Sequence, residues 1–118
     1  MKLNYFVVGT NNKPAAVTFY ESLFTDTGLT QIYSDSRMTL WQGSEFLFAV
    51  ALPFDGESAT HGNGTMVGFN VDSAEEVSTL HERALELGGT DEGAPGVRSN
   101  RFSAYVRDLD KNKLCFFE

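Results

Sequence analysis

The sequence predicts a single α+β domain, residues 1–118, made of two βαβββ units that form a curved sheet or barrel. The main observation is an internal repeat: the segment from Tyr5 to Phe24 aligns without a gap on the segment from Met66 to Leu85. Each copy contains an apolar strand, a polar turn and an amphipathic helix. A chain of this length can bury one core of its own. A duplicated half-domain of this kind typically places its functional cavity between the halves.

The first unit is expected over about residues 1–53. The β-branched and aromatic run from Leu3 to Val8 predicts a strand. Pro14 suits the first turn of the helix that follows, because its missing N–H would be unpaired there, and apolar side chains at helical spacing extend this helix to Phe24. Turn residues then separate three further predicted strands, at Thr30 to Tyr33, Met38 to Gln42, and Phe46 to Leu52.

The second unit is expected over about residues 64–118, after a connector at about 54–63 that is rich in Gly, Ser, Thr and Asn. Its first strand is predicted at Thr65 to Val71. Ser73 and Glu76 form a capping box that starts the second helix, and this helix should stop before Gly88 and Gly89. The remainder is predicted as a loop over Gly93 to Asn100 and a hairpin of Phe102 to Arg107 with Lys113 to Glu118.

Composition and charge indicate which partners to expect. The formal net charge is −7 and the few basic residues are scattered, so nucleic acid is not an expected partner. An acidic surface serves solubility, and it would also favour a cationic small molecule. No apolar run is long enough to span a membrane, and Met1 leads directly into a strand, so no membrane partner and a cytoplasmic location are expected. The only cysteine is Cys115, which leaves no disulfide within one chain.

Two stretches carry a resemblance to a known family: Gly88 to Arg98, and Tyr105 to Leu114. With the repeated βαβββ plan, the chain resembles the vicinal oxygen chelate superfamily, which includes glyoxalase I, extradiol dioxygenases, and fosfomycin and bleomycin resistance proteins. The turn Asp108 to Asn112 looks like the family's Asp-Pro-Asp-Gly-Asn turn, with Leu109 in place of Pro and Lys111 in place of Gly. The resemblance implies two cups of strands whose pairing, within a chain or across a dimer, forms the cavity.

The resemblance also implies a place for a divalent metal in the metal-dependent members, through His, Glu or Gln side chains. Those positions fall on Tyr5, Met66 and Cys115, with the fourth near Leu47 or Phe48. A phenol, a thioether and a thiol make a poor site for Ni, Zn, Mn or Fe(II). We therefore expect no metal and no other cofactor, and no metal-dependent glyoxalase I or dioxygenase activity.

Period-two alternation predicts the lining of the cavity. The expected ligand-binding residues are Tyr5, Val7, Phe48, Met66, Gly68, Asn70, Arg98, Arg101, Tyr105, Cys115 and Phe117. Within this set, Arg98 and Arg101 are the candidates to hold a ligand carboxylate. The helix side of the sheets should carry the core residues Phe6, Val8, Val67, Phe69, Leu114 and Phe116. His61 and His81 are expected to face solvent.

Two classes of function stay open at this point. The first is a metal-free binding module resembling the bleomycin resistance proteins, which sequesters a small organic molecule in an apolar and aromatic cavity. The alternative is a metal-independent lyase or isomerase that uses acid/base or thiol chemistry of Tyr5, Tyr105 or Cys115. The resemblance implies a homodimer in either case.

Overall fold

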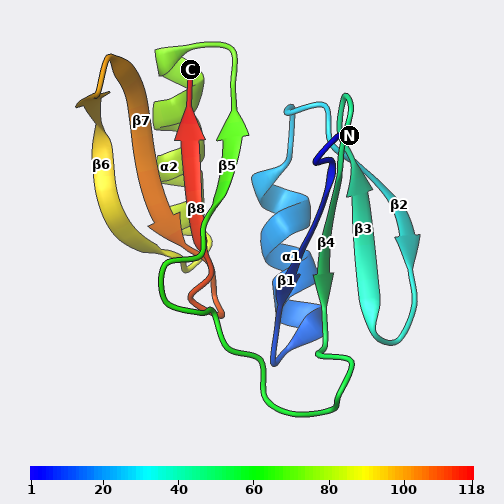
Figure 1. The fold of residues 1–118 in the computed structure, drawn as a ribbon. Helices are drawn as coiled ribbons and strands as arrows, with labels where there is room; N and C mark the ends of the chain where they lie inside the picture. Colours follow the sequence, from blue (N-terminus) through cyan, green and yellow to red (C-terminus); the bar gives the residue numbers. More distant parts are fainter.

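The computed structural model describes residues 1–118 as two four-stranded sheets, each with one helix packed on it (Figure 1). The first sheet and its helix contain β1 Tyr5–Gly9, α1 Lys13–Leu23, β2 Thr30–Ser34, β3 Met38–Gln42 and β4 Leu47–Ala51. The second contains β5 Val67–Asn70, α2 Ala74–Glu86, β6 Thr90–Arg98, β7 Arg101–Arg107 and β8 Lys113–Phe117. This order confirms the predicted α+β fold of two βαβββ units, although the two sheets do not close into a barrel.

The two sheets have the same strand order, β1-β4-β3-β2 and β5-β8-β7-β6. In each sheet the first strand pairs in parallel with the last one, so that Phe6 lies beside Phe48 and Phe69 beside Phe116. The other pairs are antiparallel hairpin neighbours. As a result β1 and β5 each lie at the edge of their sheet, and each leaves one side of its backbone unpaired.

Each helix begins at a side-chain cap. The Asn12 side chain accepts a hydrogen bond from the N–H of Ala15 at the start of α1, and Ser73 accepts one from the N–H of Glu76 at the start of α2. These contacts satisfy amide groups that have no partner within the helix. Neither helix is long and apolar enough to cross a membrane.

One hydrophobic core joins the two halves. It contains Tyr20, Trp41 and Phe48 from the first half together with Val106 and Leu114 from the second, all fully buried. The predicted core positions Val8, Leu114 and Phe116 are buried, and Phe6, Val67 and Phe69 are partly buried against the same core. Because the halves share a core, neither is expected to be stable alone.

The second half differs from expectation at the segment predicted as a loop. Residues Gly93 to Arg98 continue the edge strand β6, which pairs with β7 through two irregularities in register near Gly93 and Gly96. Glycine and proline bend this strand without ending it, because an edge strand tolerates bulges and a missing N–H on its free side. Ser99 and Asn100 form a two-residue turn with φ values of 49° and 67°.

A buried hydrogen-bond network connects the halves at the turn between β7 and β8. The Tyr20 hydroxyl donates to Asp108 Oδ2 at 2.5 Å, and the Asn112 amide nitrogen donates to both Asp108 Oδ2 and the carbonyl of Gly9, each at 2.9 Å. Asp108 Oδ1 accepts two backbone N–H groups of its own turn. In that turn Lys111 has a φ of 70°, the conformation that glycine adopts most easily.

The turn between β2 and β3 predicts a measurable dependence of stability on pH. Asp35 accepts the Tyr33 hydroxyl and the N–H groups of Arg37 and Met38, and these bonds lower its pKa to about 2. A carboxyl with a depressed folded pKa contributes stability above its unfolded pKa and loses it as pH falls through the folded value. The stability difference between wild type and Asp35→Asn should therefore shrink between about pH 4 and pH 2 in urea unfolding experiments. Asp55→Asn is the control, and an equal pH dependence in both variants would contradict the assignment.

Candidate functional site

A groove of about 670 Å³ lies between the two halves of the chain. One wall is the segment before β1 with Phe6 and the β3–β4 turn, and the opposite wall is β5 with the start of α2. The segment between α1 and β2 also lines the groove, through Phe24 and Leu29. The groove thus runs between the unpaired edges of the two sheets, and its volume suits a small organic molecule.

Aromatic side chains form the floor of the groove. The ring of Phe69 lies at its centre, with ring centroids 5.8 Å from Phe24, 6.3 Å from Phe46 and 6.0 Å from Phe116. Phe46 is held against the backbone of Gly43, where an added Cβ would lie 2.5 Å from the ring. Glycine at that position is therefore what allows Phe46 to fold over the turn. Such a floor offers a large apolar contact area.

The rim of the groove is polar and mainly acidic. Glu45, Asp72 and Glu76 contribute three carboxyl groups, whereas Lys2 contributes the one amino group of a side chain. The Lys2 amino group lies 3.7 Å from Glu45 in an exposed ion pair, so it neutralises only part of that charge. A rim of this composition favours a neutral or cationic ligand over an anion.

The sequence-predicted cavity residues lie mainly on the sheet faces that point away from the helices, not in the groove. Of that set, the groove includes only Gly68 and Asn70. In the second sheet the register places Cys115 between Gly68 and Tyr105, and Phe117 beside Asn70. Tyr105 lies directly opposite Cys115 in the pairing of β7 with β8. The second half therefore brings its predicted residues together.

In the first half, fewer of the predicted cavity residues lie on the sheet face that points away from the helix. Tyr5 and Val7 are about half exposed on β1, and the Tyr5 hydroxyl donates to the sulfur of Met38 at 3.6 Å within the same sheet. Met66, in the second half, precedes β5 and is also about half exposed, so it does not join the other predicted residues of its half. Neither Tyr5 nor Cys115 lines the groove. The sheet faces that point away from the helices therefore do not meet in that cavity.

Two expectations are wrong. Phe48 was expected in the cavity, but it pairs with Phe6 and Trp41 on the helix side of the sheet and has 0% of its surface exposed. The physical reason is the register of β4, which turns Leu47 rather than Phe48 toward the Tyr5 face. His81 was expected to face solvent, but it is 7% exposed, with Nε2 2.9 Å from Asp91 Oδ1.

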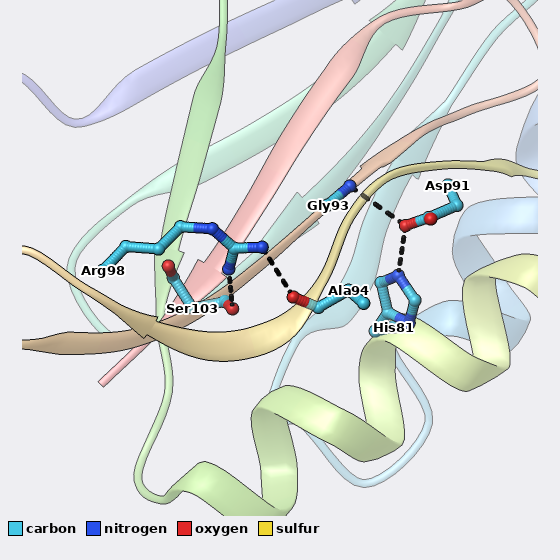
Figure 2. A network of polar contacts seen from close by, with 6 residues as sticks. All are labelled: His81, Asp91, Gly93, Ala94, Arg98 and Ser103. Atoms are coloured by element: carbon cyan, nitrogen blue, oxygen red, sulfur yellow. Dashed lines mark hydrogen bonds and ion pairs between the residues drawn. The ribbon is translucent and has the colours of Figure 1, made fainter.

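Figure 2 shows how polar contacts shape the strand β6. Asp91 Oδ1 contacts His81 and also accepts the N–H of Gly93 at 3.0 Å, which fixes the first irregularity of the strand. These bonds, with the one to His81 largest, lower the pKa of Asp91. Further along, the Arg98 guanidinium donates to the carbonyl oxygens of Ser103 at 2.6 Å and Ala94 at 2.7 Å. Arg98 is thus held in place across the β6–β7 hairpin.

The environment of Cys115 does not favour a thiolate. The residue is 5% exposed, and burial raises the pKa of its thiol, although the neighbouring Tyr105 hydroxyl and the charges of Arg98 and Lys113 act in the opposite direction. A nucleophilic or acid/base cysteine needs a pKa lowered toward neutral pH. The geometry therefore gives no support to thiol chemistry at this position.

The residues at the family's metal positions do not fit a divalent ion. Tyr5 contacts the thioether of Met38, Cys115 lies opposite Tyr105 in the β7–β8 pairing, and the position on β4 is occupied by Leu47, which has no donor atom. No group of three or more His, Cys, Asp or Glu side chains lies close enough together to hold a metal. Hard and borderline cations prefer imidazole and carboxylate donors, so this donor set does not match them.

Comparison with solved structures identifies the class of protein that this architecture defines. No protein-family model and no curated protein matches the sequence. A glyoxalase/bleomycin resistance protein from Albidiferax ferrireducens T118 is 31% identical, with a TM-score of 0.91 over 98% of this chain and 96% of that one. A lactoylglutathione lyase from Agrobacterium tumefaciens is 16% identical, with a TM-score of 0.75 over 99% of this chain and 92% of that one. A fosfomycin resistance protein from Mesorhizobium loti is 19% identical, with a TM-score of 0.74 over 98% and 90%.

The two more distant structures show that this chain shares their fold. The structure from Albidiferax ferrireducens T118 is similar in sequence as well as in fold, because the identity extends over nearly the whole of both chains. The chain belongs to the glyoxalase/bleomycin resistance protein family.

Apart from Gly68 and Asn70, the groove residues have no cavity role in the sequence-based prediction. Phe69 and Phe116 were assigned to the core, and Phe24 and Phe46 to their helix and strand, without any role in a cavity. Alternation along a strand places side chains on a face, but it does not say where two edges leave space between them. The one usable signal was Phe46, an aromatic residue directly after the polar turn Gly43-Ser44-Glu45.

Proposed function

We propose that the protein binds a small organic molecule, neutral or cationic and largely apolar, in the groove between its two halves. The observation that carries this proposal is the aromatic floor around Phe69 inside a cavity of about 670 Å³. Binding pockets combine such apolar surfaces with a few polar groups that orient the ligand. The carboxyl groups of the rim favour a neutral or cationic ligand over an anionic one.

Family membership supports the same function. The similar protein from Albidiferax ferrireducens T118 is described as a glyoxalase/bleomycin resistance protein, and sequestration of a bulky compound requires a groove and no catalytic group. A role as a binding module is also compatible with a thiol of raised pKa at Cys115 and with the poor donor set at the metal positions. We therefore propose sequestration rather than turnover.

The test uses ¹⁵N-labelled protein titrated with 2-naphthamide and with (2-naphthylmethyl)ammonium. Both probes should shift the NMR signals of the backbone amides of Val67 and Phe69. Phe46→Ala should weaken the binding of both probes about tenfold, because about 1.4 kcal/mol of apolar contact is lost. Leu3→Ser, at an exposed position of the rim, should weaken binding less while leaving the fold intact.

Phe54→Ala is the matched control, because Phe54 is 91% exposed and lies outside the groove. Equal losses of affinity in Phe46→Ala and Phe54→Ala, or shifts that leave Val67 and Phe69 unchanged, would sink the proposal. Native mass spectrometry of protein purified without chelator reports any co-purified ligand. It also tests the proposed homodimer, which should appear at twice the 13.0 kDa mass of the chain.

A further inference from the structure

The sheet edges that border the groove differ from the outer edges of the two sheets. The outer edges are β2 and β6, and their pairing with the neighbouring strands contains shifts in register. Such irregularities protect an edge against the addition of another strand. The edge strand β5 instead pairs with β8 in unbroken register and contains no lysine or proline. Its free side is therefore regular enough to accept a further strand.

The backbone of β5 leaves hydrogen-bonding groups free on the side of the groove. In a parallel pair, alternate residues of a strand bond to the neighbour and the residues between them point away. The N–H of Val71 donates to the carbonyl of Phe117 at 2.7 Å, so Phe69 also bonds to β8, whereas Gly68 and Asn70 turn their N–H and C=O groups outward. Both of these residues are exposed and line the groove, and their backbone groups have no other hydrogen-bond partner. Two donors and two acceptors thus stand at the spacing that an added strand requires.

The edge strand β1 shows that such outward groups acquire partners where the two halves meet. The N–H of Thr10 donates to β4, so the preceding residue Gly9 turns its carbonyl outward, and this carbonyl accepts the amide of Asn112 at 2.9 Å. Gly68 and Asn70 lie instead where the groove separates the halves. Their free groups are therefore available to a molecule in the groove.

We infer that the groove takes a short peptide in an extended conformation, which adds a strand to the edge of β5. This inference rests on the proposed function, because it names the class of molecule that occupies the same groove. Strand addition combines main-chain hydrogen bonds with pockets for alternate side chains. Side chains two residues apart, about 7 Å along the peptide, would lie on the aromatic floor around Phe69 and Phe46.

The charge of the rim specifies the ends of the peptide. Asp72 lies just beyond β5, and its N–H donates to Glu76 Oε2 at 3.3 Å, so these two acidic residues stand together at one end of the groove. None of the three ion pairs of the protein includes Asp72 or Glu76. Lysine or arginine next to the apolar positions of the peptide would complement these carboxyl groups.

The probe is the blocked peptide acetyl-Lys-Phe-Thr-Phe-Lys-amide, which carries a lysine at each end and therefore suits either strand direction. Its binding to ¹⁵N-labelled protein should slow the hydrogen exchange of the Gly68 and Asn70 amides and change that of Phe69 little, because the Phe69 amide already bonds to β8. The same peptide with glutamate in place of both lysines should bind at least about fivefold more weakly.

Two singly N-methylated forms of the peptide test the main-chain pairing directly. One carries the methyl group on the nitrogen of the threonine and the other on the nitrogen of the second phenylalanine. Only one of two neighbouring N–H groups points toward β5 in a paired strand. The affinities of the two forms should therefore differ at least about tenfold, as expected for one lost and sterically blocked hydrogen bond.

Asn70→Pro tests the same bond from the side of the protein. It removes an outward N–H without removing a bond to β8, and an edge strand tolerates proline in that orientation. The variant should bind the peptide about tenfold more weakly. Val7→Pro is the control, because it removes an outward N–H from β1 at a position outside the groove. The amide spectrum reports whether each variant keeps the fold, and the N-methylated peptides test the inference on the unchanged protein.

Equal affinities of the two N-methylated forms, or unchanged exchange at Gly68 and Asn70 with the peptide bound, would overturn the inference. Slow exchange at these two amides in the free protein would also overturn it, because a second copy of the chain would then cover the edge. If the naphthyl probes bind at the floor and the peptide does not, this inference fails and the proposed function stands. If neither binds, the proposed function fails as well.

Discussion

Truncation of Phe48 to alanine should destabilise the protein by about 3–5 kcal/mol. The ring is completely buried and packs against Tyr20 at 4.9 Å, Phe24 at 5.5 Å and Phe69 at 5.5 Å between ring centroids. Its removal leaves a cavity where the two halves meet, because Phe69 belongs to the second sheet, whereas Tyr20 lies in α1 and Phe24 directly follows it. Equilibrium unfolding in urea, followed by the fluorescence of Trp41, measures the loss.

The matched control is Phe54→Ala, which should change stability by less than about 0.5 kcal/mol because that ring is exposed in the connector. The comparison also distinguishes a Phe48 side chain buried in the core from one that lines a ligand cavity. If Phe48 lined a ligand cavity, its truncation would weaken probe binding and leave stability nearly unchanged. A loss of less than about 1 kcal/mol for Phe48→Ala would therefore contradict the buried position.

Replacement of Asp108 by alanine should cost about 3 kcal/mol or more. The carboxylate accepts the Tyr20 hydroxyl, the Asn112 amide group and two backbone N–H groups, and all of them would lose their partner in a buried site. Burial raises the pKa of Asp108, and burial together with the neighbouring charge of Asp108 raises the pKa of Tyr20. Burial thus disfavours the charged form of both partners, and the hydrogen bonds to Asp108 offset part of that effect for its carboxyl group.

Tyr20→Phe removes only one of these bonds and should cost about 2 kcal/mol. Tyr33→Phe is the control, because it deletes a hydroxyl bond to Asp35 of 2.7 Å at an exposed site, where the loss should stay below about 0.5 kcal/mol. Since Tyr20 and Asp108 come from different halves, Tyr20→Phe should also lower hydrogen-exchange protection in both sheets. Protection lost in only one sheet would mean that the bond does not couple the halves.

The local pattern of the sequence was sufficient for most of the fold. The repeat of Tyr5 to Phe24 in Met66 to Leu85 predicts α1 and α2 in equivalent positions, and Ser73 and Asn12 start these helices in the structure. Alternation placed Phe6, Val8, Leu114 and Phe116 on the helix side correctly. It was wrong at Phe48, because a shift of one residue in register exchanges the two faces of a strand.

The segment from Gly93 to Arg98 shows a second limit of local signals. Its glycines and proline are typical of a loop, yet β6 continues through it, because the pairing with β7 and the bonds of Asp91 and Arg98 hold the irregular strand in place. Those partners are distant in the sequence or depend on the hairpin having formed. Composition alone therefore could not distinguish a bulged edge strand from a loop.

The sequence by itself determined the two βαβββ units, the capping box of the second helix and the family resemblance, since each depends on residues close together in the chain or on a direct internal repeat. Only the tertiary structure decided how the halves meet. The groove around Phe69, the bridge from Tyr20 to Asp108 and the free edge of β5 beside the groove all depend on how separate elements are placed. The physical reason is that spaces and hydrogen bonds between elements depend on packing and strand register over long sequence separations, which periodicity along the chain does not encode.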